Sequence, residues 1–201
     1  ALDHPLGTAI GPQPNGPLRL VVFGGSQGAR YFSDAVPPAL ASLPPELRGR
    51  LSVIQQCRPE DLERVRAAYA EARIAAELAP FFSNLPELMA YAHLVVARAG
   101  ASSVAELTVI GRPSILVPLP HALDNDQLQN ATRLAESGAA WCIEQKDLDE
   151  ARLAGEIKGL AEAPGRLFAA AAAARSCGRA DAVERLADLV EELMAGAATR
   201  V

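Results

Sequence analysis

The feature that most constrains the fold is an alternation, from Pro17 onward, of short apolar runs with longer stretches of helical periodicity. Apolar strands that alternate with helices are typical of a parallel sheet covered on both faces. We therefore predict an α/β fold with a Rossmann-like, doubly wound parallel sheet. The predicted strands are residues 18–24, 51–57, 75–79, 94–97, 114–118 and 140–144. The predicted helices are residues 27–43, 59–72, 85–92, 102–110, 125–137 and 147–162.

The chain divides into three parts. Residues 1–16 are rich in Pro and Gly and lack periodicity, which indicates an interdomain linker. Residues 17–175 form the predicted domain, and residues 176–201 carry an amphipathic C-terminal helix. This helix either packs on the edge of its own domain or reaches toward a domain outside this chain. Its apolar stripe consists of Val183, Leu186, Leu189, Val190 and Met194. Because the first residue is Ala rather than Met, we expect either a processed chain or a piece cut from a longer protein.

Composition argues against several classes of function. A formal net charge of −5 disfavours broad nucleic-acid binding, which depends on clustered Lys and Arg. No apolar run reaches the roughly 18 residues that span a bilayer, and the N-terminus does not have the pattern of a signal peptide. Cys57, Cys142 and Cys177 are far apart and form no CxxC pair, which excludes a disulfide scaffold and a zinc ribbon.

A glycine turn follows the first predicted strand. In the run LRLVVFGGSQGAR, residues 24–29 join this strand to the start of a helix. Backbone N–H groups at a helix N-terminus favour an anion, and glycines let a phosphate approach the backbone closely. The structural alternative is a plain strand-to-helix turn. The turn contains no lysine, so we exclude a P-loop. A nicotinamide site is disfavoured because the second strand ends in Cys57 and Arg58 rather than in an acid.

The same turn also fits GxSxG, the nucleophile elbow of α/β-hydrolases, with Ser26 in the nucleophile position. In that class an acid and then a histidine follow the serine along the chain. The last histidine here is His121, and its surroundings do not resemble a base on a late loop. The sequence also lacks an HGGG-type oxyanion segment. A hydrolase is therefore a disfavoured alternative.

A second turn, at residues 98–101, follows the fourth predicted strand and precedes a helix that we expect to open at Ser102 or Ser103. Ser103 with Glu106 fits S-x-x-E, a capping box, which would explain Glu106 without a ligand. The alternative comes from topology, because loops after parallel strands gather at one edge of the sheet. There the two turns could hold a diphosphate between two helix N-termini, and Glu106 could accept hydrogen bonds from ribose hydroxyls.

A third loop, PLPHALDNDQLQNA at residues 118–131, is rich in amides and acids. Amides both donate and accept hydrogen bonds, which suits the hydroxyls of a sugar. Asp124-Asn125-Asp126 also spells DxD, a metal–diphosphate motif in one class of glycosyltransferases. We favour helix capping by Asp or Asn over a metal site.

Three segments together carry a resemblance to a known family. GGSQGAR, RAGASSVAE and GRPSILVPLPHALDNDQLQNA resemble the C-terminal half of the MurG family, UDP-N-acetylglucosamine transferases that convert lipid I to lipid II in peptidoglycan synthesis. The similarity covers roughly residues 17–195. It implies the C-terminal, donor-binding domain of a GT-B glycosyltransferase, an enzyme with two Rossmann-like domains.

The resemblance implies roles for individual residues. Ser26 matches a serine that contacts the nucleotide sugar near its phosphates. Phe82 matches a position whose backbone binds the uracil edge. Glu106 matches a glutamate that holds the ribose hydroxyls, and Gln127 matches a glutamine that contacts the N-acetylglucosamine hydroxyls. Arg98 matches an arginine near the site. The positions that match the helix N-terminus beneath the diphosphate are Ala101, Ser102, Ser103, Val104 and Ala105.

This chain departs from the family in two respects. Asp126 stands where members often have His or Gln, and the preceding loop is one residue longer than in some members, which affects the sugar contacts. More importantly, the family's N-terminal half is absent. That half carries the likely catalytic base, the lipid I site and the membrane-facing patch, so no catalytic residue is expected on this chain.

The resemblance has further consequences. We expect UDP-N-acetylglucosamine as donor, no metal or other cofactor, and no nucleic-acid partner. The whole enzyme would work at the cytoplasmic face of the bacterial membrane as a peripheral protein, and this chain alone would be inactive. Two alternatives stay open: a separate donor-binding subunit of a two-chain transferase, and a non-catalytic module that binds nucleotide sugars.

Overall fold

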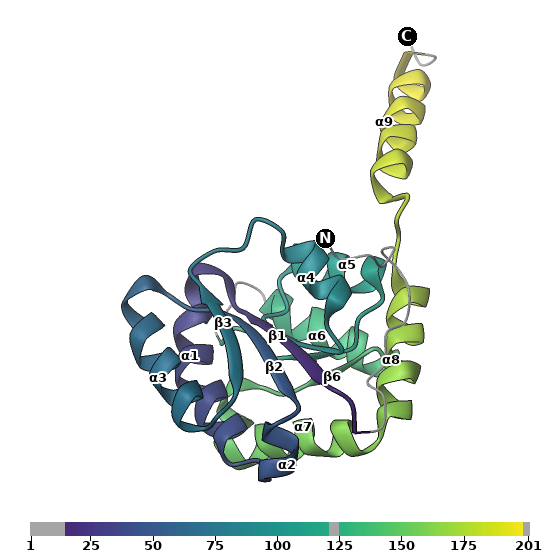
Figure 1. Ribbon diagram of the computed structural model, residues 1–201. Helices are drawn as coiled ribbons and strands as arrows, with labels where there is room; N and C mark the ends of the chain where they lie inside the picture. Colours follow the sequence, from purple (N-terminus) through teal and green to yellow (C-terminus); the bar gives the residue numbers. More distant parts are fainter. Residues whose placement is uncertain (1–14, 121–124, 199–201) are drawn as a thin grey trace.

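The structure is a computed structural model and describes residues 15–120 and 125–198. Within them, six parallel strands form one sheet in the order β3-β2-β1-β4-β5-β6 (Figure 1). This is the strand order of a doubly wound Rossmann fold, so the predicted fold is confirmed. The strands are β1 (Leu18–Phe23), β2 (Leu51–Gln56), β3 (Ala75–Ala79), β4 (Leu94–Ala97), β5 (Ser114–Leu116) and β6 (Ala140–Cys142).

Helices connect successive strands and cover both faces of the sheet (Figure 1). The α-helices are α1 (Gly25–Ala41), α2 (Pro45–Arg48), α3 (Leu62–Glu71), α4 (Leu85–Tyr91), α5 (Ala101–Ile110), α6 (Asp126–Glu136), α7 (Glu150–Glu162), α8 (Pro164–Cys177) and α9 (Ala182–Ala198). Short 3-10 turns are η1 (Pro59–Asp61) and η3 (Gln145–Asp147).

The sheet separates two hydrophobic layers. Leu20 and Val22 of β1 face a cluster that includes the buried sides of α1, α3 and α7. Val21 and Phe23, on the opposite face of the same strand, face a cluster formed with α4, α5 and α6. Alternate side chains of a strand point to opposite faces, so a central strand buried on both faces is apolar over most of its length, here at every position of β1 except the half-buried Arg19. This is the pattern from which the sheet was predicted.

Helix α1 continues through Pro37 and Pro38, which would ordinarily break or kink a helix. Each proline leaves one carbonyl oxygen of the preceding turn without its usual N–H donor. For Pro37 that carbonyl belongs to Ser33, and it instead accepts a hydrogen bond from Arg64 Nη1 of α3 at 3.2 Å. A side chain of the neighbouring helix thus replaces the bond that the proline removes.

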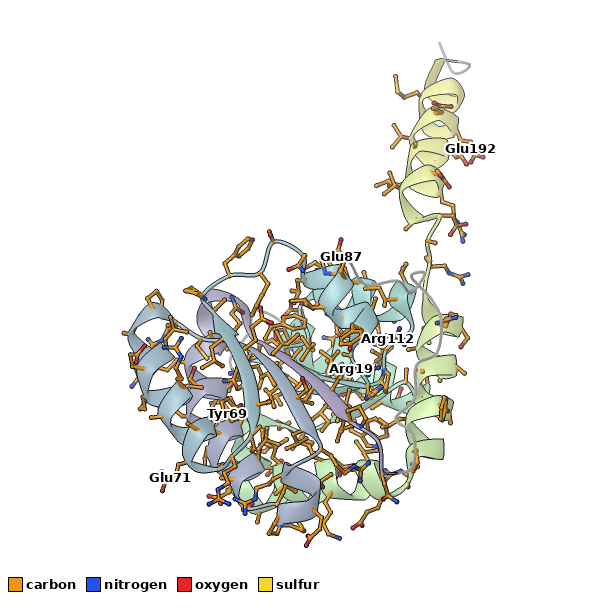
Figure 2. The ribbon with its side chains drawn as sticks, in the orientation of Figure 1. Arg19, Tyr69, Glu71, Glu87, Arg112 and Glu192 are labelled. Carbon is orange, nitrogen blue, oxygen red and sulfur yellow. The ribbon has the colours of Figure 1, made fainter. Side chains whose placement is uncertain are left out.

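A group of basic side chains lies near the start of strands β1, β4 and β5. Arg19 of β1 and Arg112 lie close together (Figure 2), and the charges of both act on His93. His93 and Arg112 are buried. His93 Nδ1 accepts a hydrogen bond from the backbone N–H of Arg19 at 3.0 Å. Burial, and then the charges of Arg19 and Arg112, lower the pKa of His93 from 6.5 to about 4. The histidine is therefore neutral in the folded protein at pH 7.

Helix α9 is the predicted amphipathic helix, but its apolar stripe does not pack on the sheet domain. Figure 1 shows α9 extending away from the layered body beyond α8. The first of the two predicted roles, packing on the edge of its own domain, is therefore not observed. The exposed apolar side chains are Val183, Leu186, Leu189, Val190 and Met194.

The strand starts agree with the prediction, whereas several ends were placed too late. The apolar run of β5 continues to Pro118, but its register with β4 and β6 ends at Leu116. The four-residue helix α2, which follows Pro44, was not predicted. No helix in the described part of the chain is both long and apolar enough to cross a membrane.

Candidate functional site

The candidate site lies where the carboxyl ends of β1 and β4 meet. These two strands are neighbours in the sheet, and the chain builds outward from them in opposite directions. In open α/β sheets, ligands bind in the crevice at this switch point. A cavity of about 200 Å³ opens here, which confirms that the two glycine-containing turns converge. Its lining consists of Phe23, Gly24, Gly25, Gly28, Arg98, Gly100, Ser103, Leu119 and Gln127.

Two glycines shape the first turn for different reasons. A Cβ on Gly24 would lie 2.4 Å from the carbonyl carbon of Gly28, so no larger residue fits. Gly25 has a φ of +62°, a backbone conformation that favours glycine. Gln56, at the end of β2, holds this turn: its Oε1 accepts hydrogen bonds from the N–H groups of Gly24 (3.3 Å) and Gly25 (3.0 Å).

Gln56 also joins this turn to the loop after β3. Its Nε2 donates a hydrogen bond to the carbonyl oxygen of Pro80 at 3.1 Å. The sequence analysis did not identify this residue as part of the site. The available signal was its position as the last residue of a strand that ends at the ligand-binding edge.

The second turn starts helix α5 earlier than predicted. Gly100 is the N-cap residue, α5 begins at Ala101, and no side chain caps it. Ser103 therefore stands inside the helix rather than at its cap, and the predicted capping box with Glu106 is wrong. The reason is that Gly100 takes an extended conformation, which places the helix start before either serine. Glu106 is exposed on α5, one turn further along.

The third loop is tied to the second by two amide side chains of α6. Gln127 Oε1 accepts hydrogen bonds from the N–H groups of Leu119 (3.1 Å) and Ala99 (3.3 Å). Asn130 Nδ2 donates to the carbonyl oxygen of Ala99 at 3.1 Å. Since the Oε1 of Gln127 is engaged within the protein, its amide N–H groups are the atoms that remain for a ligand.

Arg98 lies under both turns and is only 6% exposed. Its Nη1 donates to the carbonyl oxygens of Val117 and Pro118, both at 3.0 Å, and its Nη2 donates to Gln145 Oε1 at 2.7 Å. The guanidinium also lies 5.0 Å from the ring centre of Tyr31. Burial lowers the pKa of Arg98 below its usual value, but an arginine stays charged in proteins.

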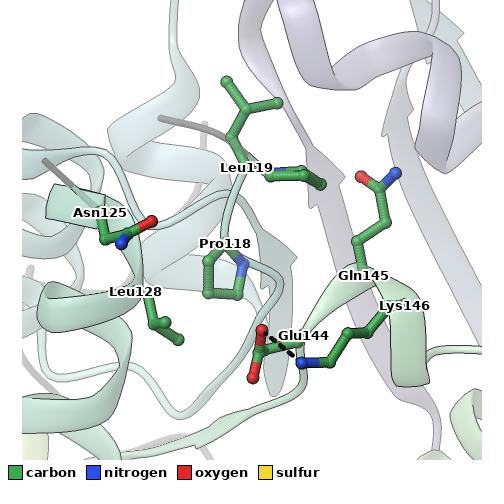
Figure 3. A pocket seen from close by; sticks show the side chains of 8 residues that line it. Pro118, Leu119, Asn125, Leu128, Glu144, Gln145 and Lys146 are labelled. Atoms are coloured by element: carbon green, nitrogen blue, oxygen red, sulfur yellow. Dashed lines mark ion pairs between the residues drawn. The ribbon is translucent and has the colours of Figure 1, made fainter. Parts of the chain in front are cut away.

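Two further cavities adjoin the first. One of about 550 Å³ lies at the ends of β2 and β3 and shares Gly25 with the first; Phe81 lines it with its side chain 75% exposed. Another of about 330 Å³ shares Leu119 and lies between α6 and η3, where Lys146 pairs with Glu144 at 3.2 Å (Figure 3). The three cavities form a row along the carboxyl edge of the sheet.

Only some of the predicted site residues line one of these cavities. Ser103 and Gln127 line the central cavity. Ser26 lies in the first turn of α1, but its side chain is outside the described part of the structure. Phe82 is half-buried and packs against the second hydrophobic cluster, next to the exposed Phe81. The positions of α5 outside the central cavity are Ala101, Ser102, Val104, Ala105 and Glu106.

The metal and hydrolase alternatives gain no geometric support. Asp124 of the DxD run and His121 lie outside the described residues. Asn125, at the N-cap position of α6, makes no capping hydrogen bond, so the helix capping that we favoured is not observed at this residue. Asp126 Oδ1 accepts a hydrogen bond from the N–H of the adjacent Gln127 at 2.7 Å. Within residues 15–120 and 125–198, no three His, Cys, Asp or Glu side chains gather as metal ligands would.

Comparison with known protein families gives a direct result. A family model, the glycosyltransferase family 28 C-terminal domain, matches residues 19–189. The chain belongs to this family. The match covers the sheet from Arg19 onward, the two glycine turns and the first half of α9, so the resemblance predicted from the three segments is confirmed.

Two relatives of this family 28 domain carry the same protein name. A protein of Rhodopseudomonas palustris is 59% identical over 90% of this chain and 49% of its own length. One of Methylobacterium nodulans is 56% identical over 97% of this chain and 54% of its own length. Both are named UDP-N-acetylglucosamine--N-acetylmuramyl-(pentapeptide) pyrophosphoryl-undecaprenol N-acetylglucosamine transferase. The chain thus spans about half the length of these relatives.

Solved structures agree with this placement. The crystal structure of Acinetobacter baumannii MurG superposes with a TM-score of 0.81 at 31% identity, over 90% of this chain and 53% of the other. The predicted fold, the C-terminal domain of a GT-B glycosyltransferase, is therefore confirmed. A UDP-N-acetylglucosamine 2-epimerase from Listeria monocytogenes, with a TM-score of 0.68 at 14% identity, shares the fold alone.

Proposed function

We propose that this family 28 domain binds the donor, UDP-N-acetylglucosamine, for an enzyme that transfers N-acetylglucosamine to lipid I in peptidoglycan synthesis. The observation that carries the proposal is the convergence of two glycine turns and two helix N-termini on one cavity at the switch point of the sheet. Relatives more than 55% identical are named for this transfer. Their length, about twice that of this chain, supports a second domain in the whole protein.

The proposed donor lies along the row of cavities. The diphosphate occupies the central cavity, against Ser26 and the start of α5 at Ala101–Ala105. The uracil lies toward the loop after β3, with the backbone of Phe82 at its edge and the exposed ring of Phe81 beside it. Glu106 holds the ribose hydroxyls, and the amide N–H groups of Gln127 contact the sugar.

The proposed reaction follows from this placement. The C4 hydroxyl of the muramoyl sugar of lipid I attacks the anomeric carbon of the donor, with inversion, and UDP departs. Negative charge develops on the departing diphosphate, and helix N-termini with free backbone N–H groups stabilise such charge. The base that removes the hydroxyl proton belongs, in this proposal, to an N-terminal domain outside this chain, so this chain alone is inactive.

The same N-terminal domain would complete the molecule. We propose that it binds lipid I, contacts the cytoplasmic face of the membrane, and is joined to this domain through residues 1–16. The exposed apolar stripe of α9 supports a packing surface for it, because an amphipathic helix gains stability by burying its apolar side. A separately encoded donor subunit would use the same surfaces and would differ in the mass of the native gene product.

Calorimetric titration tests the donor site. We expect this chain to bind UDP-N-acetylglucosamine in preference to UDP-glucose, and not to bind NAD. Glu106→Ala should weaken donor binding roughly 10- to 100-fold, since a hydrogen bond to a charged group contributes about 1.5–3 kcal/mol. Glu71→Ala, at the exposed end of α3, is the matched control and should bind as the unchanged chain does. Unchanged affinity in a folded Glu106→Ala variant would remove Glu106 from the site.

A further inference from the structure

We propose that Arg98 supplies the positive charge for a diphosphate group in the central cavity and positions the glycine turn that holds this group. The inference rests on the proposed function for the identity of the nucleotide, but its own ligand class is the diphosphate. The observation behind it is a buried cation whose partners are all neutral.

The charge of Arg98 is not balanced within the described part of the chain. Its hydrogen-bond acceptors are two backbone carbonyl oxygens and the amide oxygen of Gln145. The ion pairs of the described residues do not include it. A buried charge with neutral partners alone is costly to a fold, whereas a bound anion would compensate it.

One donor atom of Arg98 is still unused. Its Nε is buried and has no hydrogen-bond partner, although the residue is more than nine-tenths buried and lines the central cavity. Fully buried donors are nearly always paired in folded proteins, so this unpaired Nε, which is covered by Gly28 of the glycine turn, adds to the cost of burying the guanidinium without an anion. A diphosphate in the adjoining cavity would supply the compensating negative charge, and phosphate is a favoured partner of arginine.

Arg98 also fixes the position of the glycine turn relative to the neighbouring loops. A Cβ on Gly28 would lie 2.8 Å from Cγ and 2.9 Å from Nε of Arg98, so the turn rests directly on the arginine stem. The same side chain is bonded to the loop after β5 and to Gln145 of η3. It therefore sets the distance between the turn after β1 and the loops after β5 and β6, which together border the cavity.

The test compares ligands that differ only in phosphate content. The affinities of this chain for uridine, UMP, UDP and inorganic pyrophosphate are measured by calorimetry for the unchanged chain, Arg98→Lys and Arg98→Met. We expect Arg98→Met to weaken the binding of UDP and of pyrophosphate roughly 10- to 100-fold, because the positive charge that compensates the diphosphate is lost. The affinity for UMP should fall less, and the affinity for uridine should not change. Arg98→Lys keeps the charge and should restore part of the loss.

Arg112→Lys is the matched control, because Arg112 is also buried and bonded to backbone carbonyls, of Met89 and Ala90, but lies outside the central cavity. It should leave all four affinities unchanged. Equal weakening of all four ligands by the Arg98 variants would show a merely structural residue and overturn the proposal. So would an unchanged chain that does not bind pyrophosphate. If Arg98→Met does not fold, Arg98→Lys alone decides by the same comparison.

The outcome also separates this inference from the proposed function. Arg98-dependent binding of pyrophosphate without a preference for UDP-N-acetylglucosamine would contradict the proposed donor and leave the diphosphate site standing. Selective binding of UDP-N-acetylglucosamine that Arg98→Met does not weaken would contradict the role of Arg98 and support the proposed donor.

Discussion

His93 is a titratable group that the proposed chemistry does not use, and its surroundings work against its protonated form. It is 3% exposed, and the N–H of Arg19 donates to its Nδ1. Protonation would remove that acceptor and add a third positive charge beside Arg19 and Arg112. In the unfolded chain the same imidazole is solvated, and its pKa returns toward 6.5.

This difference predicts a loss of stability in mild acid. Between pH 6.5 and about 4 the unfolded chain binds a proton that the folded chain does not, so the free energy of unfolding falls as the pH falls through this window. The full effect is about 3 kcal/mol, at about 1.4 kcal/mol for each pKa unit. Urea unfolding at a series of pH values measures it.

His93→Gln provides the comparison, because glutamine can accept the Arg19 hydrogen bond but does not titrate. The variant should lose less stability than the unchanged chain between pH 7 and pH 4. Parallel pH profiles for the two proteins would mean that His93 titrates alike in the folded and unfolded states.

At the scale of elements, replacing a glycine by alanine should destabilise the glycine turn but stabilise α7. Gly24 has no room for a Cβ, Gly25 has space but a positive φ, and Gly155 lies in the exposed interior of α7 with open space around it. Sequence type alone does not distinguish the three positions. Their surroundings do, and they predict three different results for the same substitution.

We expect Gly24→Ala to destabilise most, by about 1–3 kcal/mol, through overpacking against Gly28. Gly25→Ala should cost about 1–2 kcal/mol because alanine disfavours the left-handed conformation. Gly155→Ala should stabilise by about 0.5–1 kcal/mol, the helix preference of alanine over glycine. Denaturant unfolding of the three variants gives the order, and a Gly24→Ala variant as stable as Gly155→Ala would show that the turn relaxes freely.

Elements were more predictable than their boundaries and their local contacts. The six strands could be found because each is an apolar run between helical stretches, and pairing then follows from the α/β order. The end of β5 could not, because it depends on where β4 and β6 stop pairing. The continuation of α1 through Pro37 depends on Arg64, thirty-one positions from the Ser33 carbonyl that it contacts.

In the site, too, the overall arrangement was predictable from the sequence, whereas the local contacts were not. The meeting of the two turns follows from topology, and Gln127 reaches the cavity from the loop where the resemblance placed it. The capping box failed because Ser103 fits the motif, but Gly100 starts the helix. Gln56 and Gln145 were missed because they act through long-range hydrogen bonds that no local pattern marks.

At the scale of the whole molecule, α9 should contribute little to the stability of the sheet domain. Its stripe is exposed, and area that stays in contact with water gives no hydrophobic stabilisation. Removal of residues 180–201 should therefore leave the urea midpoint unchanged. By contrast, Leu167→Ala in α8, whose side chain is 2% exposed, should cost about 2–5 kcal/mol. A lower midpoint after the truncation would show that α9 packs on this domain.

The strand order also says something about how this domain assembles. β1, β2 and β3 are neighbours in the sheet in sequence order, and so are β4, β5 and β6, whereas β1 and β4 join the two halves through pairs such as Leu20 with Leu94. This seam requires the longest loop closure in the sheet, and distant pairings form slowly. The central cavity lies at the end of the seam, with one glycine turn from each half. A bound diphosphate would therefore hold the two halves together, and exchange of the β1 and β4 amides with solvent would slow as ligand is added.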